Sequence, residues 1–108
     1  MMTTIAVNSK DAFRAEVLEN PGTVLAGFTA EWCPYCKAKA SLLSRLADKT
    51  NDYKFCRIDV DKAVGIDDAY GVMAIPTLMV FKNGKPSAFK MIAYLDDVEI
   101  EDFINSHI

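Results

Sequence analysis

The chain has 108 residues, of which 51% are hydrophobic and 25% charged, and these values favour one globular domain over residues 1–108. A formal net charge of −3 with scattered basic residues disfavours a nucleic-acid-binding protein. The N-terminal residues lack a basic patch followed by a long apolar run, so neither a signal peptide nor a membrane-spanning segment is expected. Three cysteines are too few for the disulfide framework of a secreted protein, which favours a reducing, cytoplasmic compartment.

Apolar periodicity and turn residues divide the chain into alternating strands and helices. In chain order, we expect a strand over residues 3–7, a helix ending at residues 20–22, a strand over residues 23–29, a helix ending near residues 49–52, a strand over residues 53–60, a short helix over residues 63–70, strands over residues 77–81 and 89–93, and a helix from residue 96 to about residue 106. Helices between the early strands make those strand pairs parallel, whereas the terminal hairpin is antiparallel. The pattern predicts an α/β fold of order β-α-β-α-β-α-β-β-α, with a mixed five-stranded central sheet flanked by four helices.

Three local signals support these boundaries. Residues 8–11 (NSKD) offer a cap for the start of the first helix. Asn83 and Gly84 form a dipeptide that is a strong signal for a tight hairpin turn. Asp96 and Glu99 have the spacing of a capping box, which predicts the start of the last helix.

Two cysteines separated by two residues, in the segment Cys33-Pro34-Tyr35-Cys36, indicate redox chemistry in a chain with a βαβ pattern. The strand-like residues 23–29 lead into this segment and a helical pattern follows it, so Cys33 is expected at a helix N-terminus. Unpaired amides and the helix dipole at that end favour the thiolate, which is the reactive form of cysteine. Cys33 is therefore the candidate nucleophile, and Cys36, within the first turn, is the candidate resolving thiol.

A metal-binding role for this cysteine pair is disfavoured. A structural zinc ion needs four ligands, and no second ligand pair accompanies the motif. The single histidine, His107, is remote in sequence at the end of the chain. We therefore expect no metal site.

Three segments of the chain resemble the thioredoxin family, in order and at matching separations. Residues 28–37 (FTAEWCPYCK) resemble its active-site segment, residues 70–77 (YGVMAIPT) resemble the segment with its cis-proline, and residues 81–85 (FKNGK) resemble its final hairpin. The chain thus resembles a thioredoxin over essentially its whole length. This resemblance implies a thioredoxin fold and a thiol–disulfide oxidoreductase.

Four features depart from the usual thioredoxin pattern. The dipeptide Pro34-Tyr35 replaces Gly-Pro between the cysteines and is typical of glutaredoxins. Gly27 stands where the family usually has a buried Asp, and Thr29 stands where a Trp is usual. Ile92 stands where the family has a glycine on the loop facing the active site, and we expect it to give that site a bulkier, more apolar rim.

The resemblance also implies which residues meet a protein substrate. Trp32 is expected to form an exposed apolar platform beside Cys33. The bond before Pro76 is expected to be cis, and the backbone of Ile75 is expected to pair with an extended substrate segment. The full implied substrate-binding set is Trp32, Pro34, Tyr35, Ala74, Ile75, Pro76 and Ile92.

The implied activity is reduction of protein disulfides by a monomer that takes electrons from a thioredoxin reductase and needs no bound cofactor. Two alternatives stay open. The Pro-Tyr dipeptide is compatible with a glutathione-linked, glutaredoxin-like enzyme. A non-enzymatic thioredoxin-like protein, acting as a binding subunit or holding an iron–sulfur cluster between two chains, is the other alternative.

Other polar and sulfur-containing residues have simpler interpretations. Cys56 alternates with apolar residues on a strand, which predicts a buried, inert thiol. Asp96 and Asp97 resemble the Asp-Asp of glutathione-binding glutaredoxins, but a helix cap is the favoured interpretation. Asp59 and Asp61 are expected at a solvated strand end.

Overall fold

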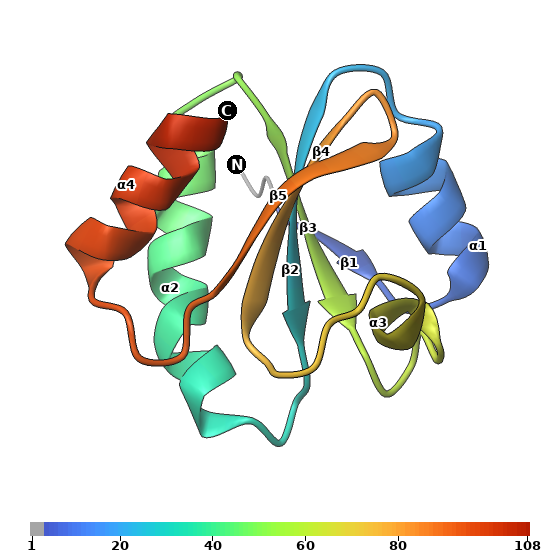
Figure 1. Cartoon of the computed structure of the whole chain (residues 1–108), viewed down its shortest axis with the longest axis horizontal. Helices are drawn as coiled ribbons and strands as arrows, with labels where there is room; N and C mark the ends of the chain where they lie inside the picture. The colour runs from blue at the N-terminus through green and yellow to red at the C-terminus, as the bar shows by residue number, and fades with distance from the viewer. Residues whose placement is uncertain (1–3) are drawn as a thin grey trace.

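A five-stranded sheet lies at the centre of the computed structural model, which describes residues 4–108 (Figure 1). The strands are β1 (Thr4–Val7), β2 (Thr23–Thr29), β3 (Lys54–Asp59), β4 (Thr77–Lys82) and β5 (Lys85–Met91). Their order across the sheet is β1-β3-β2-β4-β5. Strand β3 pairs in parallel with β1 and β2, whereas β4 pairs antiparallel with β2 and β5. The predicted mixed sheet is confirmed.

Helical segments cover both faces of this sheet (Figure 1). One face carries α1 (Lys10–Phe13), its continuation η1 (Arg14–Leu18) and α3 (Ile66–Ala69). The other face carries α2 (Pro34–Asp48) and α4 (Asp97–His107). Within residues 4–108, the structure describes no helix that is both long and apolar enough to cross a membrane.

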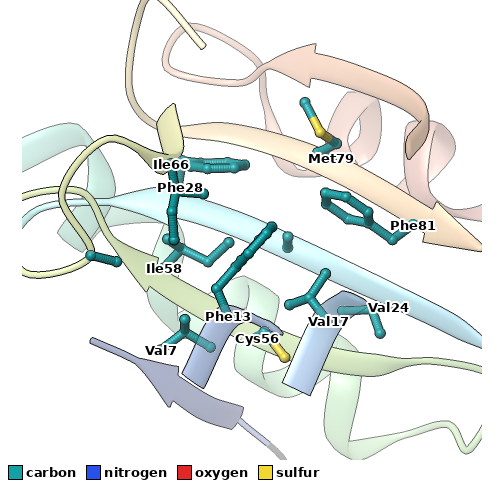
Figure 2. Close-up of a cluster of buried hydrophobic side chains, with 12 residues drawn as sticks. Val7, Phe13, Val17, Val24, Phe28, Cys56, Ile58, Ile66, Met79 and Phe81 are labelled. Carbon is teal, nitrogen blue, oxygen red and sulfur yellow. The ribbon is translucent and has the colours of Figure 1, made fainter. Parts of the chain in front are cut away.

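Side chains alternate between the two faces of each strand, so the sheet separates two apolar clusters. Figure 2 shows the cluster under α1 and η1, where Phe13 and Val17 pack against strand residues that include Ile58 and Phe81. The opposite cluster lies under α2 and α4 and contains Leu25, Leu42, Leu43, Ala47, Phe55, Leu78, Val80, Ile92, Ile100 and Ile104. Cys56 belongs to the first cluster and is fully buried, as its alternating pattern predicts.

The predicted caps and turn are present. The Ser9 hydroxyl accepts the amide of Ala12 at 3.0 Å at the start of α1. Asp96 and Glu99 form the reciprocal bonds of a capping box at the start of α4, which supports the interpretation of Asp96 as a cap. In the β4–β5 turn, Asn83 has a φ of 52° and Gly84 a φ of 80°, as a tight two-residue hairpin requires.

Three elements differ from the sequence prediction. The first helix widens at Arg14–Leu18, where the Glu19 amide donates to the carbonyl of Arg14 five residues earlier, at 2.8 Å. The strand predicted over residues 89–93 begins at Lys85, because the tight turn places Lys85 directly opposite Lys82 and pairing starts at once. The helix predicted over residues 63–70 is shortened to Ile66–Ala69. The predicted first residue of β1, Thr3, lies outside the described residues.

Ile92 does not form the expected apolar rim. Its side chain is fully buried in the cluster under α2 and α4, so it belongs to the core of that face. Its backbone lies beside Pro76, where the Ile92 amide donates to the Pro76 carbonyl at 3.0 Å. A side chain at this position stabilises the fold and adds no bulk for a partner to meet.

Replacing Ile92 with Ala should therefore destabilise the protein. Truncation of a fully buried Ile leaves a cavity and removes apolar contacts, and we expect a loss of about 2–5 kcal/mol in the free energy of unfolding. Denaturant unfolding measures this loss. Val98→Ala, at an exposed position of α4, is the matched control and should change stability by less than about 0.5 kcal/mol. Equal effects of the two substitutions would contradict the buried placement of Ile92.

Candidate active site

Both cysteines of the motif lie where β2 leads into α2. Cys33 is the N-cap residue of α2 and has extended backbone, with a φ of −87° and a ψ of 110°. Pro34 follows at the first helical position, where its missing amide proton costs no hydrogen bond. The Cys33 Sγ accepts the backbone amide of Cys36 at 3.2 Å. A sulfur that accepts a helix N-terminal amide is suited to carry negative charge.

Both cysteine residues of the motif are buried. Cys33 is 3% exposed and Cys36 is 5% exposed, and both are free thiols. They form a small cluster with Ala30, against which Ile75 packs. Access of a substrate sulfur to Cys33 therefore depends on the surface immediately around this cluster.

Burial raises the pKa of the Cys36 thiol above its usual 9.0, and the hydrogen bond with Cys33 raises it further. Two hydrogen bonds act in the opposite direction on this pKa, one from the Thr29 hydroxyl and one from the backbone of Ala30. Desolvation is the largest cause because it disfavours the charged thiolate. Cys36 is therefore held mainly as a thiol at neutral pH.

A small cavity of about 30 Å³ lies behind Cys36, between α2 and the sheet. Gly27 and Cys36 both line this cavity. A Cβ atom at position 27 would lie 3.3 Å from Cε1 of Phe55, which is tighter than an ordinary van der Waals contact. Gly27 therefore leaves room that the ring of Phe55 partly fills.

The segment before β4 lies beside the sulfurs. The Ile75–Pro76 peptide bond is cis, as expected, and Pro76 lines the cavity together with Cys36. Ala74 is exposed and Ile75 is half-buried. In Figure 1 this segment, the β2–α2 connection and the β5–α4 connection all lie at the lower end of the view.

Exposed aromatic side chains flank the cysteine pair. Trp32 is 66% exposed, which supports a platform and excludes core packing. Its indole Nε1 donates to the Asp61 carboxylate at 2.7 Å, so the ring is held in one orientation. Tyr35 is half exposed, and its ring meets that of Tyr94 edge-on at a centroid distance of 5.4 Å.

The sequence did not predict two further exposed apolar side chains, Tyr94 beside Tyr35 and Met73 in the segment before β4. Tyr94 is 85% exposed and Met73 is 95% exposed. Met73 directly precedes Ala74, so its place next to a segment already singled out was the available signal. No local pattern pointed to Tyr94, because its contact with Tyr35 joins residues far apart in the chain.

Asp59 is largely covered by protein, whereas the sequence predicted a solvated strand end. It is 7% exposed, and its Oδ1 accepts the backbone amides of Asp61 at 2.9 Å and Lys62 at 3.2 Å. It lines an open groove of about 360 Å³ that also reaches Cys36. Within residues 4–108, no group of three or more His, Cys, Asp or Glu side chains is placed to hold a metal ion.

Comparison with known proteins identifies the family. The family model named Thioredoxin matches residues 4–106. The chain belongs to the thioredoxin family. It is therefore a thiol–disulfide oxidoreductase with a redox-active cysteine pair.

Curated relatives and solved structures agree with this assignment. Thioredoxin of Pseudomonas aeruginosa is 38% identical over 99% of this chain and 100% of its own length. Thioredoxin of Bacillus subtilis is 37% identical over 90% of this chain and 91% of its own length. A mutant thioredoxin from Halobacterium salinarum has a TM-score of 0.82 at 30% identity, covering 96% of this chain and 89% of its own. Malassezia sympodialis thioredoxin has a TM-score of 0.84 at 27% identity, covering 99% of this chain and 92% of its own.

Alkylation should distinguish the three thiols by pH. The thiolate is the form of cysteine that reacts with iodoacetamide. Because the pKa of Cys36 is raised above 9.0, at most about 1% of this thiol is ionised at pH 7. Cys36 should therefore be alkylated slowly at pH 7 and faster as the pH rises. Cys33 should be labelled first by brief iodoacetamide treatment, as mass mapping can show. Cys56 is an internal control, because burial raises its pKa to about 11. Preference for Cys36 at pH 7 would contradict the assignment.

Introducing a carboxyl at position 27 should alter both the stability of the protein and the rate at which a mixed disulfide is resolved. Gly27→Asp forces Phe55 to shift and buries a carboxyl, so we expect a loss of roughly 1–3 kcal/mol in unfolding free energy. It also adds a proton acceptor to the cavity that Cys36 lines, so resolution of a Cys33 mixed disulfide should be faster at pH 7. Gly27→Ala is the matched control, with crowding but no carboxyl. An Asp variant with unchanged stability and unchanged rate would disprove this placement.

Proposed function

We propose that this protein reduces disulfide bonds in other proteins by cycling between a Cys33–Cys36 dithiol and a Cys33–Cys36 disulfide. The observation that carries the proposal is the position of the Cys33 sulfur, which accepts the Cys36 amide at the start of α2. This amide favours negative charge on Cys33, whereas burial raises the pKa of Cys36 and so favours its protonated form before it attacks the mixed disulfide. The two thiols therefore have different tasks.

In the first step, the Cys33 thiolate attacks one sulfur of a substrate disulfide. The substrate S–S bond breaks, a Cys33–substrate S–S bond forms, and the released substrate sulfur takes up a proton. In the second step, Cys36 loses its proton and attacks the Cys33 sulfur. The mixed disulfide breaks and the Cys33–Cys36 bond forms. The substrate leaves with two thiols in place of its disulfide, which is a reduction by two electrons.

The substrate surface follows from the exposed groups around the sulfurs. Trp32 and Tyr35 offer apolar rings beside Cys33. The backbone of Ala74 and Ile75, next to Pro76, offers main-chain groups to an extended substrate segment. Protein disulfides in extended segments fit this surface better than small compact molecules.

The electron donor is proposed to be a thioredoxin reductase, in a reducing, cytoplasmic compartment. Family membership supports this donor, and the sparse cysteines support the compartment. The second candidate donor is the glutathione system, which the Pro34-Tyr35 dipeptide favours by resemblance to glutaredoxins.

Reduction of insulin disulfides tests both the cycle and the donor. Wild type should be active with NADPH and a thioredoxin reductase, and the assay is repeated with glutathione and glutathione reductase in its place. Cys33→Ser should abolish turnover. Cys36→Ser should also stop turnover but trap a mixed disulfide at Cys33, visible by mass. Turnover by Cys33→Ser, or an adduct formed at Cys36, would contradict the proposed roles.

A further inference from the structure

Cys36 must lose a proton before it can attack the Cys33–substrate disulfide, because the thiolate is the nucleophile. It is 5% exposed, so bulk water does not reach it freely. Some group in the protein therefore has to connect this thiol to solvent.

The cavity behind Cys36 does not supply that group. Position 27 carries no side chain, and the charged residues among those that line the cavity are two cations, Lys39 and Arg57. The Lys39 ammonium donates to the Leu95 carbonyl at 2.6 Å. Neither a protonated ammonium nor a guanidinium accepts a proton.

A second opening reaches Cys36 from the side of β3. This is the groove that contains Asp59, and its volume of about 360 Å³ admits water. The ionisable groups that face it are Glu31, Cys36, Lys37, Arg57, Asp59 and Lys62. Glu31 has a 79% exposed side chain and is held by the Lys62 ammonium at 3.0 Å. Asp59 is the buried carboxylate of the set, at 7% exposure.

Asp59 is fixed next to the residue that contacts Cys36. Its Oδ1 is held by the amides of Asp61 and Lys62, which fixes the position of the carboxylate. Thr29 is its register partner across the parallel β2–β3 pair. Hydrogen bonding with the Thr29 side chain lowers the pKa of Cys36, because it favours the thiolate. Cys36, Thr29 and Asp59 line one groove, and Thr29 is paired with Asp59 across the two strands.

We propose, on the basis of the function proposed above, that Asp59 accepts the proton of Cys36 through water in this groove, with Thr29 positioning the thiol. The Cys36 S–H bond breaks and its proton passes by way of groove water to the Asp59 carboxylate. The resulting thiolate forms the S–S bond with Cys33, and the substrate sulfur leaves as a thiolate. Asp59 then returns the proton through water to that sulfur or to solvent, so protons and electrons balance.

Stopped-flow reaction of the full, reduced protein with dithiobis(nitrobenzoate) tests this route. The first coloured thiolate is released when Cys33 is modified, and the second is released when Cys36 resolves the adduct. Asp59→Asn keeps an oxygen that can accept the two amides but cannot take a proton. We expect its second phase to be slower than wild type by about tenfold or more at pH 7. The difference should shrink as the pH rises from about 7 to about 10, because Cys36 then ionises without help.

Three further variants make the result specific. Asp59→Glu should restore most of the pH 7 rate, and Asp102→Asn, at an exposed position of α4, should leave it unchanged. Thr29→Val removes the hydroxyl at nearly constant shape. It should slow the second phase at pH 7, and its difference from wild type should shrink as the pH rises, as for Asp59→Asn. A wild-type rate in Asp59→Asn at pH 7, or an equal slowing at every pH, overturns the assignment of Asp59. Absence of a second phase in wild type overturns the proposed function and the proton route with it.

Discussion

The hydrogen bond from the Cys36 amide to the Cys33 sulfur joins the chemistry of this protein to its fold. It forms because Cys33 caps α2 with extended backbone, and α2 starts there because β2 ends at Thr29. The same geometry places Cys36 one turn into the helix, over the sheet, where it is buried. One sulfur thus accepts a helix N-terminal amide, while burial raises the pKa of the other thiol.

Because Cys36 is buried, the groups that border its thiol decide where its proton can go. Behind the thiol, Gly27 and Phe55 line a small cavity and place no carboxyl there, which avoids the energetic cost of burying one. Polar groups lie instead on the β3 side, where the turn after β3 holds Asp59 with two amides. Cys36 thus borders a small cavity lined by Gly27 and Phe55 on one side and an open groove that contains Asp59 on the other.

Much of the fold and of the redox pair could be predicted because the responsible signals are local. Apolar alternation and turn residues placed every strand within a few residues, and the capping box located the start of α4. The spacing of Cys33 and Cys36 indicates redox chemistry on its own, since two residues between cysteines bring their sulfurs onto one helical turn. The π-helical turn after Phe13 had no comparable local signal.

The chain by itself determined which elements form and which residues carry the redox chemistry, because backbone propensity, capping and short spacings act between near neighbours. Only the tertiary structure decided which side chains share a space. Ile92 follows an edge strand yet packs into the core, and Asp59 ends a strand yet is covered by protein. Tyr94 meets Tyr35 across most of the chain length. Such contacts depend on the order of strands in the sheet, where β3 lies between β1 and β2. The burial of these side chains therefore follows from the arrangement of the strands and not from the local sequence pattern.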